Sequence, residues 1–225
     1  MLYIVATPIG NRDDITLRAL RILKSVDYVL AEDTRKTGLL LSFYNIKKPL
    51  VSFFEHNEKR RIPQVIADLA AGKNIALVSN AGTPCICDPG YVLVRECRKQ
   101  GLAVTTAPGA SSTITALSLS SLPHEQFLFL GYLPRKTSAR RKLLQSLKQL
   151  ETTFVFFESP FRLAAALEDA LSVLGNKKVA VARELTKKFE EVVEGPLEQI
   201  CAGFAAKKPQ GEFVLIIDNR PQSIL

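Results

Sequence analysis

Hydrophobic and polar positions follow two alternating rhythms along the first 120 residues. Short runs rich in Val, Ile, Leu and Phe are separated by longer stretches whose apolar positions recur three and four residues apart. The short runs predict β-strands and the longer stretches predict amphipathic helices. We expect strands at residues 2–7, 27–32, 49–54, 74–79 and 102–107, and helices at 16–25, 34–44, 58–71, 91–100 and 111–120. This βαβ alternation is typical of a mostly parallel sheet that helices cover on both faces.

The rhythm changes near Ser121 and Pro123, where we place a domain boundary. Strand-like runs follow one another more closely after this point, so the second sheet is predicted to be mixed. We expect strands at residues 126–131, 152–158, 178–183, 189–194 and 212–218, and helices at 138–150, 160–174 and 196–204. The predicted fold class is α/β with two lobes, residues 1–121 and 122–225, and a cleft between two lobes is a common place for a small ligand.

Three turns rich in Gly and Pro follow predicted strands. They are ATPIGN at residues 6–11, SNAGTPCICDPG at 79–90 and APGASS at 107–112. Glycine lets the backbone approach a ligand closely, and the short polar side chains lie beside exposed N–H groups. Loops at the carboxyl ends of strands are where open α/β sheets bind ligands. One such turn is most often a plain connection, but three at equivalent places indicate one composite site.

Composition narrows the class of protein. The chain has 225 residues, of which 47% are hydrophobic and 23% charged, which is typical of a folded enzyme rather than a disordered chain. Its net charge of +8 allows a polyanionic partner without requiring one. The four cysteines form no CxxC pair, so we expect no metal site. Neither a signal peptide nor a long apolar window is visible, and we expect a cytoplasmic protein without a membrane span.

Two clusters of charged residues begin where predicted strands end. Glu32, Asp33 and Arg35 follow one strand, and Glu184 and Lys187 follow another. The first cluster also fits a helix start, with Asp33 or the next residue as the N-cap. The second also fits a solvated turn with local ion pairs. Neither structural interpretation excludes a functional role.

The stretch from residue 126 to 150 contains no acidic residue. We expect Ala139, Leu143, Leu147 and Leu150 to form the apolar stripe of its helix, which would leave the cations on the outer face. A solvated helix face is the plain explanation, but one-sided positive charge fits the phosphates of a polynucleotide better. The candidate RNA-binding residues are Arg135, Lys136, Arg140, Arg141 and Lys142.

Six motifs together resemble those of a known family. They are TPIGN at residues 7–11, AEDTR at 31–35, SNAGTP at 79–84 with DPG at 88–90, PGASS at 108–112, FESP at 157–160 and ARELT at 182–186. In this order they resemble the tetrapyrrole methylase superfamily, the class III S-adenosylmethionine (SAM)-dependent methyltransferases, over essentially the whole chain. More narrowly, they are similar to the branch that methylates the ribose 2′-oxygen of a cytidine in the decoding region of 16S ribosomal RNA in the small subunit. The resemblance implies two α/β lobes of that type with SAM in the cleft, in a homodimer.

The resemblance also implies which residues contact the cofactor. The turns would supply backbone groups for SAM, and two apolar side chains would exclude water from its sulfonium. The implied residues are Pro8, Gly10, Ala81, Gly82, Thr83, Pro84, Ile86, Ser111 and Ser112 in the first lobe, and Glu158 and Leu185 in the second.

The chain departs from the branch at three positions in the second turn. Asn80 stands where Asp is usual, and Cys85 and Cys87 stand where Gly and Ser are usual. Loss of a carboxylate near a cationic cofactor is expected to weaken its binding. Many members also continue further beyond the position of Asp218, so we expect some of their RNA contacts to be missing here.

Methyl transfer requires the 2′-oxygen in line with the S–CH₃ bond, and a base helps because a ribose hydroxyl is a poor nucleophile. We hypothesise that Glu32, Asp33 or Glu184 assists deprotonation, with Arg35 and Lys187 holding a phosphate or the oxyanion. The sequence leaves the choice open. A precorrin-type tetrapyrrole C-methyltransferase is one alternative, since it would share the cofactor cleft without needing the basic helix. A noncatalytic RNA-binding protein is the other, and it would fail to bind SAM.

Overall fold

The structure, a computed structural model, describes residues 1–205 and 210–221. The chain divides into two compact units, Met1–Ser111 and Ser112–Leu225. This division falls earlier than residues 121 and 122 because helix α5 (Ser112–Leu119) contacts strand β10 (Phe213–Asp218) of the second unit. Within the described ranges, no helix is long and apolar enough to cross a membrane.

The first unit contains a fully parallel five-stranded sheet in the order β3-β2-β4-β1-β5. A 3₁₀ helix at Arg12–Asp14 was not predicted, whereas all ten expected strands and helices up to residue 120 are present with slightly shifted ends. The strands are β1 (Leu2–Val5), β2 (Tyr28–Ala31), β3 (Leu50–Ser52), β4 (Ile75–Val78) and β5 (Val104–Ala107). The helices before α5 are α1 (Leu17–Ser25), α2 (Thr34–Phe43), α3 (Glu58–Ala70) and α4 (Tyr91–Lys99).

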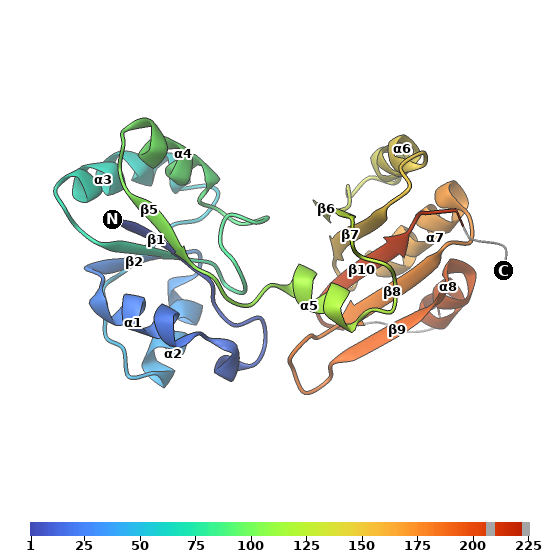
Figure 1. Cartoon of the computed structure of the whole chain (residues 1–225), viewed down its shortest axis with the longest axis horizontal. Helices are drawn as coiled ribbons and strands as arrows, with labels where there is room; N and C mark the ends of the chain where they lie inside the picture. The colour runs from blue at the N-terminus through green and yellow to red at the C-terminus, as the bar shows by residue number, and fades with distance from the viewer. Residues whose placement is uncertain (206–209, 222–225) are drawn as a thin grey trace. The chain divides into compact units, whose positions relative to one another are not determined.

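Helices cover both faces of this sheet. Figure 1 shows α3 and α4 on one face and α1 and α2 on the other. Leu30 and Leu77 pack toward α3 and α4, whereas their neighbours Val29 and Val78 pack toward α1 and α2. Because both faces are buried, β4 is apolar at every position, which is why its sequence shows no alternation. The turns at the carboxyl ends of the strands remain available for a site.

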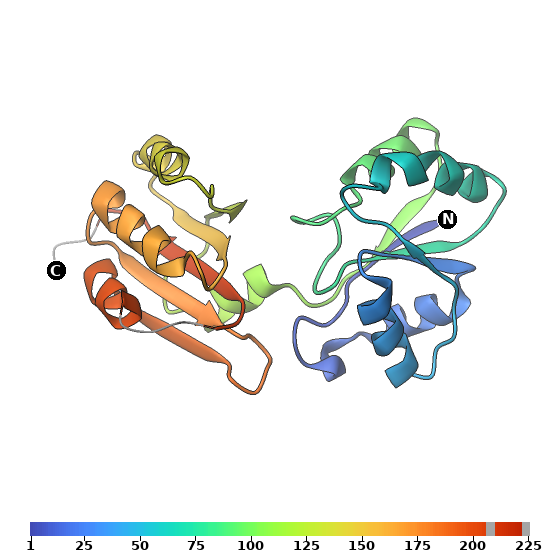
Figure 2. The same cartoon turned by 180° about the vertical axis from the view of Figure 1, so that it is seen from behind.

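The second unit contains a mixed five-stranded sheet in the order β6-β7-β10-β8-β9. The pair β6 and β7 is parallel and the other three pairs are antiparallel, which confirms the predicted mixed sheet. The strands are β6 (Phe127–Tyr132), β7 (Thr153–Glu158), β8 (Lys178–Arg183), β9 (Glu191–Pro196) and β10. Helices α6 (Thr137–Leu147), α7 (Leu163–Leu174) and α8 (Leu197–Ala205) pack on one face, and α7 and α8 lie in front of the strands in Figure 2.

Helix α6 packs Leu143 and Leu147 of the predicted apolar stripe against the core, but its buried face extends beyond that stripe. Leu144 and Arg140 are buried, whereas Ala139 and Leu150 are exposed. The prediction was wrong for Ala139, Leu150 and Arg140, because it assigned every cation to solvent. Arg140 is buried because Asp169 on α7 binds its guanidinium.

Candidate functional site

The three Gly/Pro turns of the first unit come together. Thr7 and Gly82 form an antiparallel bridge in which the Thr7 N–H donates to the Gly82 carbonyl at 2.9 Å and the Gly82 N–H donates to the Thr7 carbonyl at 3.0 Å. The Thr83 hydroxyl donates to the carbonyl of Ala110 in the third turn at 3.3 Å. Since β1 lies between β4 and β5, the turns that follow these strands form one continuous surface.

Glycine is required where these turns touch. Gly82 has φ +77°, and a Cβ there would lie 3.3 Å from Ile9 Cγ2 and 3.6 Å from the Ala110 carbonyl oxygen. A Cβ on Gly109 would lie 3.0 Å from the Cβ of Ala6. Larger residues would therefore push the turns apart.

The second turn holds two cysteines in the left-handed region, which ordinary side chains rarely adopt. Cys85 has φ 71° and Cys87 has φ 61°. Burial, followed by the nearby charges of Glu58 and Asp88, raises the pKa of the Cys85 thiol to about 11, so it is protonated at neutral pH. The Glu58 carboxylate accepts the Gly90 N–H at 3.1 Å and fixes the end of the turn. Backbone strain of this kind clusters at functional sites.

Two carboxyl groups lie close together in the segments that follow the adjacent strands β2 and β4. Glu32 accepts the backbone N–H of Asn80 at 3.1 Å. Burial, and then the negative charge of Glu32, raises the pKa of Asp88 to about 6, although a hydrogen bond from Ser79 opposes the shift. Among the described residues the buried Asn80 Oδ1 has no hydrogen-bond partner. The site thus offers negative charge and a spare acceptor, which suits a cationic ligand with hydrogen-bond donors.

Asp88 was not among the predicted catalytic or cofactor-binding residues. Its signal in the sequence is its place in the DPG end of the second turn. Its proximity to Glu32 follows only from the pairing of β2 with β4.

Asp33 and Arg35 form an ion pair. The Asp33 carboxylate is the N-cap of α2, and it accepts the Arg35 backbone N–H at 2.9 Å and the Arg35 guanidinium at 2.8 Å. The hydrogen bonds from the Arg35 side chain and backbone hold the pKa of Asp33 well below its usual value. This confirms Asp33 as the helix cap.

In the second unit, the segments that contain Glu158 and Glu184 lie at the same end of the strands. Strands β7 and β8 flank β10, and Phe213 at the start of β10 pairs with both Glu158 and Arg183. The segment that begins at Glu184 therefore starts beside Phe213, across β10 from Glu158.

Glu158 is buried with one oxygen engaged and one open. Its Oε1 accepts the Ser159 N–H at 2.8 Å and the Arg162 guanidinium at 2.6 Å, whereas Oε2 is buried with no partner among the described residues. Burial raises the pKa of Glu158, even though Ser159 and Arg162 oppose the shift. The open oxygen is suited to accept a hydrogen bond from a ligand.

Leu185 lies in a strained turn that Glu184 stabilises. Glu184 has φ 50° and Thr186 has φ 62°, and Leu185 between them is buried. The Glu184 carboxylate accepts the Lys187 ammonium at 2.9 Å and the Glu212 backbone N–H at 3.0 Å. Burial favours the neutral acid, but these bonds outweigh it and lower the pKa of Glu184. Burial likewise opposes the charge of Lys187, but bonds to Glu212 and Glu184 raise its pKa.

The basic segment is less unbalanced in the fold than in the sequence. Asp169 on α7 binds the buried Arg140 at 2.5 Å and the half-exposed Arg141 at 2.6 Å. Arg140 therefore stabilises the second unit and does not present a free cation to a partner. Exposed cations remain at Arg135, Lys136 and Lys142.

The remaining predicted cofactor residues also lie in the three turns. Gly10, Ala81 and Ile86 are exposed, Pro84 is buried, and Pro8, Ser111 and Ser112 are partly buried. Ser111 ends the first unit and Ser112 begins α5 in the second.

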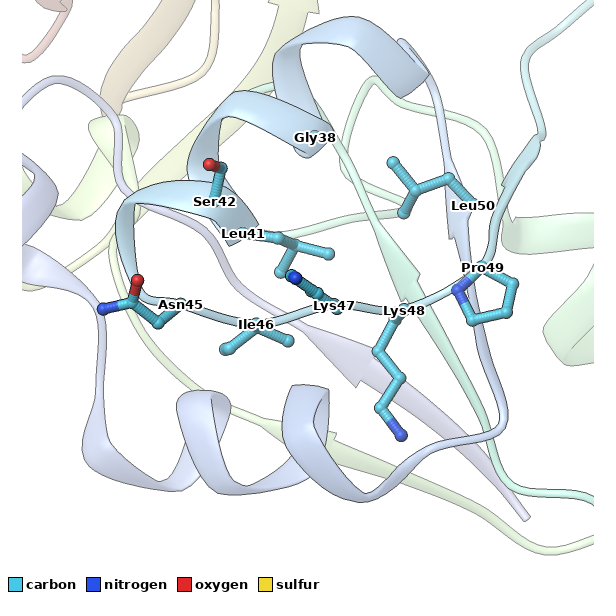
Figure 3. Close-up of a pocket in the computed structure, with 9 residues that line it drawn as sticks. All are labelled: Gly38, Leu41, Ser42, Asn45, Ile46, Lys47, Lys48, Pro49 and Leu50. Atoms are coloured by element: carbon cyan, nitrogen blue, oxygen red, sulfur yellow. The ribbon is translucent and has the colours of Figure 1, made fainter.

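A pocket of about 580 Å³ lies elsewhere in the first unit, between the end of α2 and the start of β3 (Figure 3). It includes Lys47 and Lys48 but none of the predicted site residues. Since it lies at the amino end of β3, it is opposite the turns that follow the strands. Within the part of the chain that the structure describes, no group of three or more His, Cys, Asp or Glu residues is placed to hold a metal ion.

Two α/β units, with glycine-rich turns converging at the carboxyl ends of parallel strands, are typical of a protein that binds a small ligand. Similarity to known proteins shows which family this is. The family model for Tetrapyrrole (Corrin/Porphyrin) Methylases matches residues 1–201, and the chain belongs to this family. It is similar to the ribosomal RNA small subunit methyltransferase I of Thermotoga maritima, with 48% identity over 219 residues, covering 97% of this chain and 98% of the relative. The protein of that name from Halalkalibacterium halodurans is 47% identical, covering 99% of this chain and 77% of the relative. The resemblance found in the motifs is thereby confirmed.

A solved structure shows the same fold at lower identity. Uroporphyrin-III C-methyltransferase from Thermus thermophilus, complexed with S-adenyl homocysteine, has a TM-score of 0.66 and 18% identity, covering 97% of each chain. The predicted fold class is confirmed by this likeness and by the family match.

Proposed function

We propose that this chain transfers a methyl group from SAM to the ribose 2′-oxygen of a cytidine in the decoding region of 16S ribosomal RNA within the small subunit. The convergence of the three turns through Thr7, Gly82, Thr83 and Ala110 carries the proposal of a cofactor site. The two relatives at 48% and 47% identity support the RNA substrate, since both are named as ribosomal RNA methyltransferases. The tetrapyrrole enzyme shares the fold at only 18% identity, so it is weaker support for a porphyrin-like substrate.

The residues present fit SAM. When bound, SAM supplies an electrophilic methyl group on a cationic sulfonium, and the electron pair of the S–CH₃ bond stays on sulfur when the methyl group is transferred. The carboxyl groups of Glu32 and Asp88 suit the positive charge. In the first unit, the open acceptor Asn80 Oδ1 suits a donor group of the cofactor. The resemblance assigns Glu158 of the second unit to the same cofactor, and its open Oε2 is also suited to a donor. The neutral Asn80 still provides an acceptor where the related enzymes usually carry Asp.

Among the three candidate bases, we favour Glu32. Asp33 and Glu184 each accept a hydrogen bond from a cationic side chain, and both have a lowered pKa. A lowered pKa makes a carboxylate a weaker proton acceptor. Among the described residues, Glu32 accepts one hydrogen bond, from the backbone N–H of Asn80, so its second oxygen is suited to take the proton of the ribose hydroxyl. Arg35 and Lys187 then hold Asp33 and Glu184 in place.

The proposal includes RNA contacts, a homodimer and a cytoplasmic location. Arg135, Lys136 and Lys142 are exposed cations suited to phosphates, and the outward part of Arg141 adds to them. The homodimer rests on the family resemblance. The cytoplasmic location rests on the expectation from the sequence and on the ribosomal RNA named for the two relatives.

Methylation of unmodified 30S subunits tests this function. The protein is incubated with labelled SAM and 30S subunits, and the digested RNA is analysed by mass spectrometry for 2′-O-methylcytidine. We expect incorporation into 16S RNA, and more with 30S subunits than with naked RNA. Methylation of a precorrin instead of 30S subunits would establish the tetrapyrrole alternative, and absence of SAM binding by calorimetry would establish the noncatalytic one.

Matched variants test the assignment of the base. Glu32→Gln is expected to lower kcat by about 10²-fold or more, because the proton acceptor is lost. Asp33→Asn, Glu184→Gln and Lys187→Ala are expected to keep more activity. Normal turnover in all four would eliminate every carboxylate proposed here as the base.

A further inference from the structure

The face of the second sheet that lies away from α6, α7 and α8 carries aromatic side chains at its β6 edge. Side chains alternate along a strand, and Leu128 and Leu130 of β6 pack into the core on the helix side. Phe127 and Phe129 therefore point to the opposite face. Phe157 lies on that face too, because its neighbour Phe156 is in the helix-side core.

The Phe157 ring contacts the rings of both Phe129 and Tyr132, and we call these three side chains the aromatic strip. The ring centroids of Phe129 and Phe157 are 4.9 Å apart at an interplanar angle of 67°, and those of Tyr132 and Phe157 are 5.6 Å apart at 64°. Edge-to-face contacts of this kind hold the rings in fixed positions. Tyr132 remains 58% exposed, so the strip presents a ring to solvent.

A bulge in β6 places Tyr132 beside Phe157 in the aromatic strip. The register with β7 shifts between Phe129 and Tyr132, and Gly131 in the bulge has φ +65°. Tyr132 consequently pairs with Phe157. Bulges commonly re-aim a side chain next to a functional site.

Exposed cationic side chains follow the aromatic strip in the sequence. Arg135 and Lys136 follow Tyr132 closely, and residues 126–150 contain no acid. Arg162 fixes the path between them, because its guanidinium donates to the Leu133 carbonyl at 3.1 Å. An apolar protein partner would use the rings but would gain nothing from this charge. A polyanion with flat apolar groups would use both.

We propose that the aromatic strip stacks an unpaired base of single-stranded RNA, while Arg135 and Lys136 contact the adjoining phosphates. Stacking on aromatic rings beside cations is how proteins bind single-stranded nucleic acid with little sequence preference. The strip would thus hold one nucleotide of the RNA that is methylated. This inference rests on the proposed function, because it concerns how that RNA is held.

Binding of short RNA oligonucleotides tests the strip. Fluorescence anisotropy of the full chain is measured with a labelled eight-nucleotide single strand, the same strand with abasic positions, and a duplex. Tyr132→Leu is expected to weaken binding of the intact single strand by about fivefold to a hundredfold, and Tyr132→Phe to stay within about twofold. Arg135→Ala with Lys136→Ala should reduce the slope of log affinity against log salt by about 1.4.

Phe43→Leu is the matched control. Phe43 is 51% exposed on α2 with the Arg12 guanidinium 4.4 Å from its ring centroid, so it is also an exposed aromatic beside a cation. Its replacement should leave RNA affinity unchanged. Equal losses in Phe43→Leu and Tyr132→Leu, or an equal effect of Tyr132→Leu on abasic and intact strands, would overturn the inference.

Two further measurements separate the possible failures. Sedimentation of Tyr132→Leu should match the parent chain, whereas loss of an assembled form would show that the strip is covered by a second copy and would overturn the inference. Methyl transfer to 30S subunits by the parent chain tests the proposed function alone. If the parent methylates 30S subunits and Tyr132→Leu binds the single strand normally, the strip fails while the function stands. If the parent transfers no methyl group, the function fails, and the oligonucleotide comparison still decides the strip.

Discussion

Thr7 and Gly82 each donate a backbone N–H to the other's carbonyl oxygen, at 2.9 and 3.0 Å, although they belong to turns far apart in the sequence. This bridge fixes the first turn against the second. The hydrogen bond from Thr83 to Ala110 adds the third turn. Backbone atoms make or accept all three bonds, so the surface depends on close approach of the main chains.

Substitution at Gly82 should separate fold from ligand binding. Gly82→Ala places a Cβ 3.3 Å from Ile9 in a backbone with φ +77°, so we expect a loss of about 1–2 kcal/mol in the free energy of unfolding and about a tenfold loss in SAM affinity. Gly72→Ala is the control, because Gly72 has φ +88° with nothing within 4 Å of the added Cβ. It should lose similar stability in urea denaturation but keep its SAM affinity in calorimetry. Equal SAM affinity in the two variants would contradict the placement of the site.

Glu158 should contribute to SAM binding through its open oxygen. Glu158→Gln keeps the shape of the side chain but removes the charge beside Arg162 and replaces one acceptor with a donor. We expect weaker SAM binding by calorimetry and a loss of about 1–3 kcal/mol in the free energy of unfolding. Glu168→Gln, at an exposed position on α7, should change neither quantity. Unchanged SAM affinity in Glu158→Gln would remove Glu158 from the cofactor site.

Asp88 should make stability depend on pH. Burial and the charge of Glu32 raise its pKa to about 6 in the folded chain, so the folded state holds this proton more tightly than the unfolded state. The contribution of Asp88 to the free energy of unfolding therefore falls as pH rises from about 4 to about 6. Above that range, ionised Asp88 destabilises the folded state by a constant amount.

Asp88→Asn removes this ionisation. The variant should gain about 1–2 kcal/mol over the parent at pH 7.5, where partial exposure reduces the full electrostatic effect, and it should gain little at pH 4. Urea denaturation at the two pH values measures the difference. A gain of equal size at both would show that the raised pKa is not its cause.

The buried pair of Arg140 and Asp169 should be a major structural element of the second unit. Arg140→Met leaves Asp169 buried with only the half-exposed Arg141, so we expect a loss of about 3–5 kcal/mol in the free energy of unfolding. Arg141→Ala should cost much less, because its side chain is 53% exposed. The double variant Arg140→Met with Asp169→Leu should recover part of the loss. A double variant as unstable as the sum of its single variants would argue against a coupled pair.

The sequence was sufficient to predict the strands, helices and turns, but not several side-chain pairs that form between them. Strands such as β4 were predictable because continuous apolar runs between turn residues are a local signal, and the three turns shared a local Gly/Pro pattern. The burial of Arg140 was not predictable, since it depends on Asp169 in another helix. The raised pKa of Asp88 similarly depends on Glu32 from a neighbouring strand. Such pairings arise only when the chain is folded.

The left-handed conformations were also beyond local reasoning. Cys85, Cys87, Glu184 and Thr186 have positive φ although none is glycine. Residue type alone argues against this geometry, and tertiary packing imposes it. Gly82 and Gly90 were recognisable in the sequence as residues that tolerate a positive φ, and the structure shows that Cys85 and Cys87 between them adopt it as well.

The bulge at Gly131 has a consequence for solubility during expression and storage. Strand β6 is an edge strand with the apolar sequence FLFLGY, and such an edge invites hydrogen bonding to a strand of another molecule. The register shift after Phe129 interrupts the regular row of backbone donors and acceptors that an added strand would need. The same irregularity that aims Tyr132 thereby discourages intermolecular sheet growth.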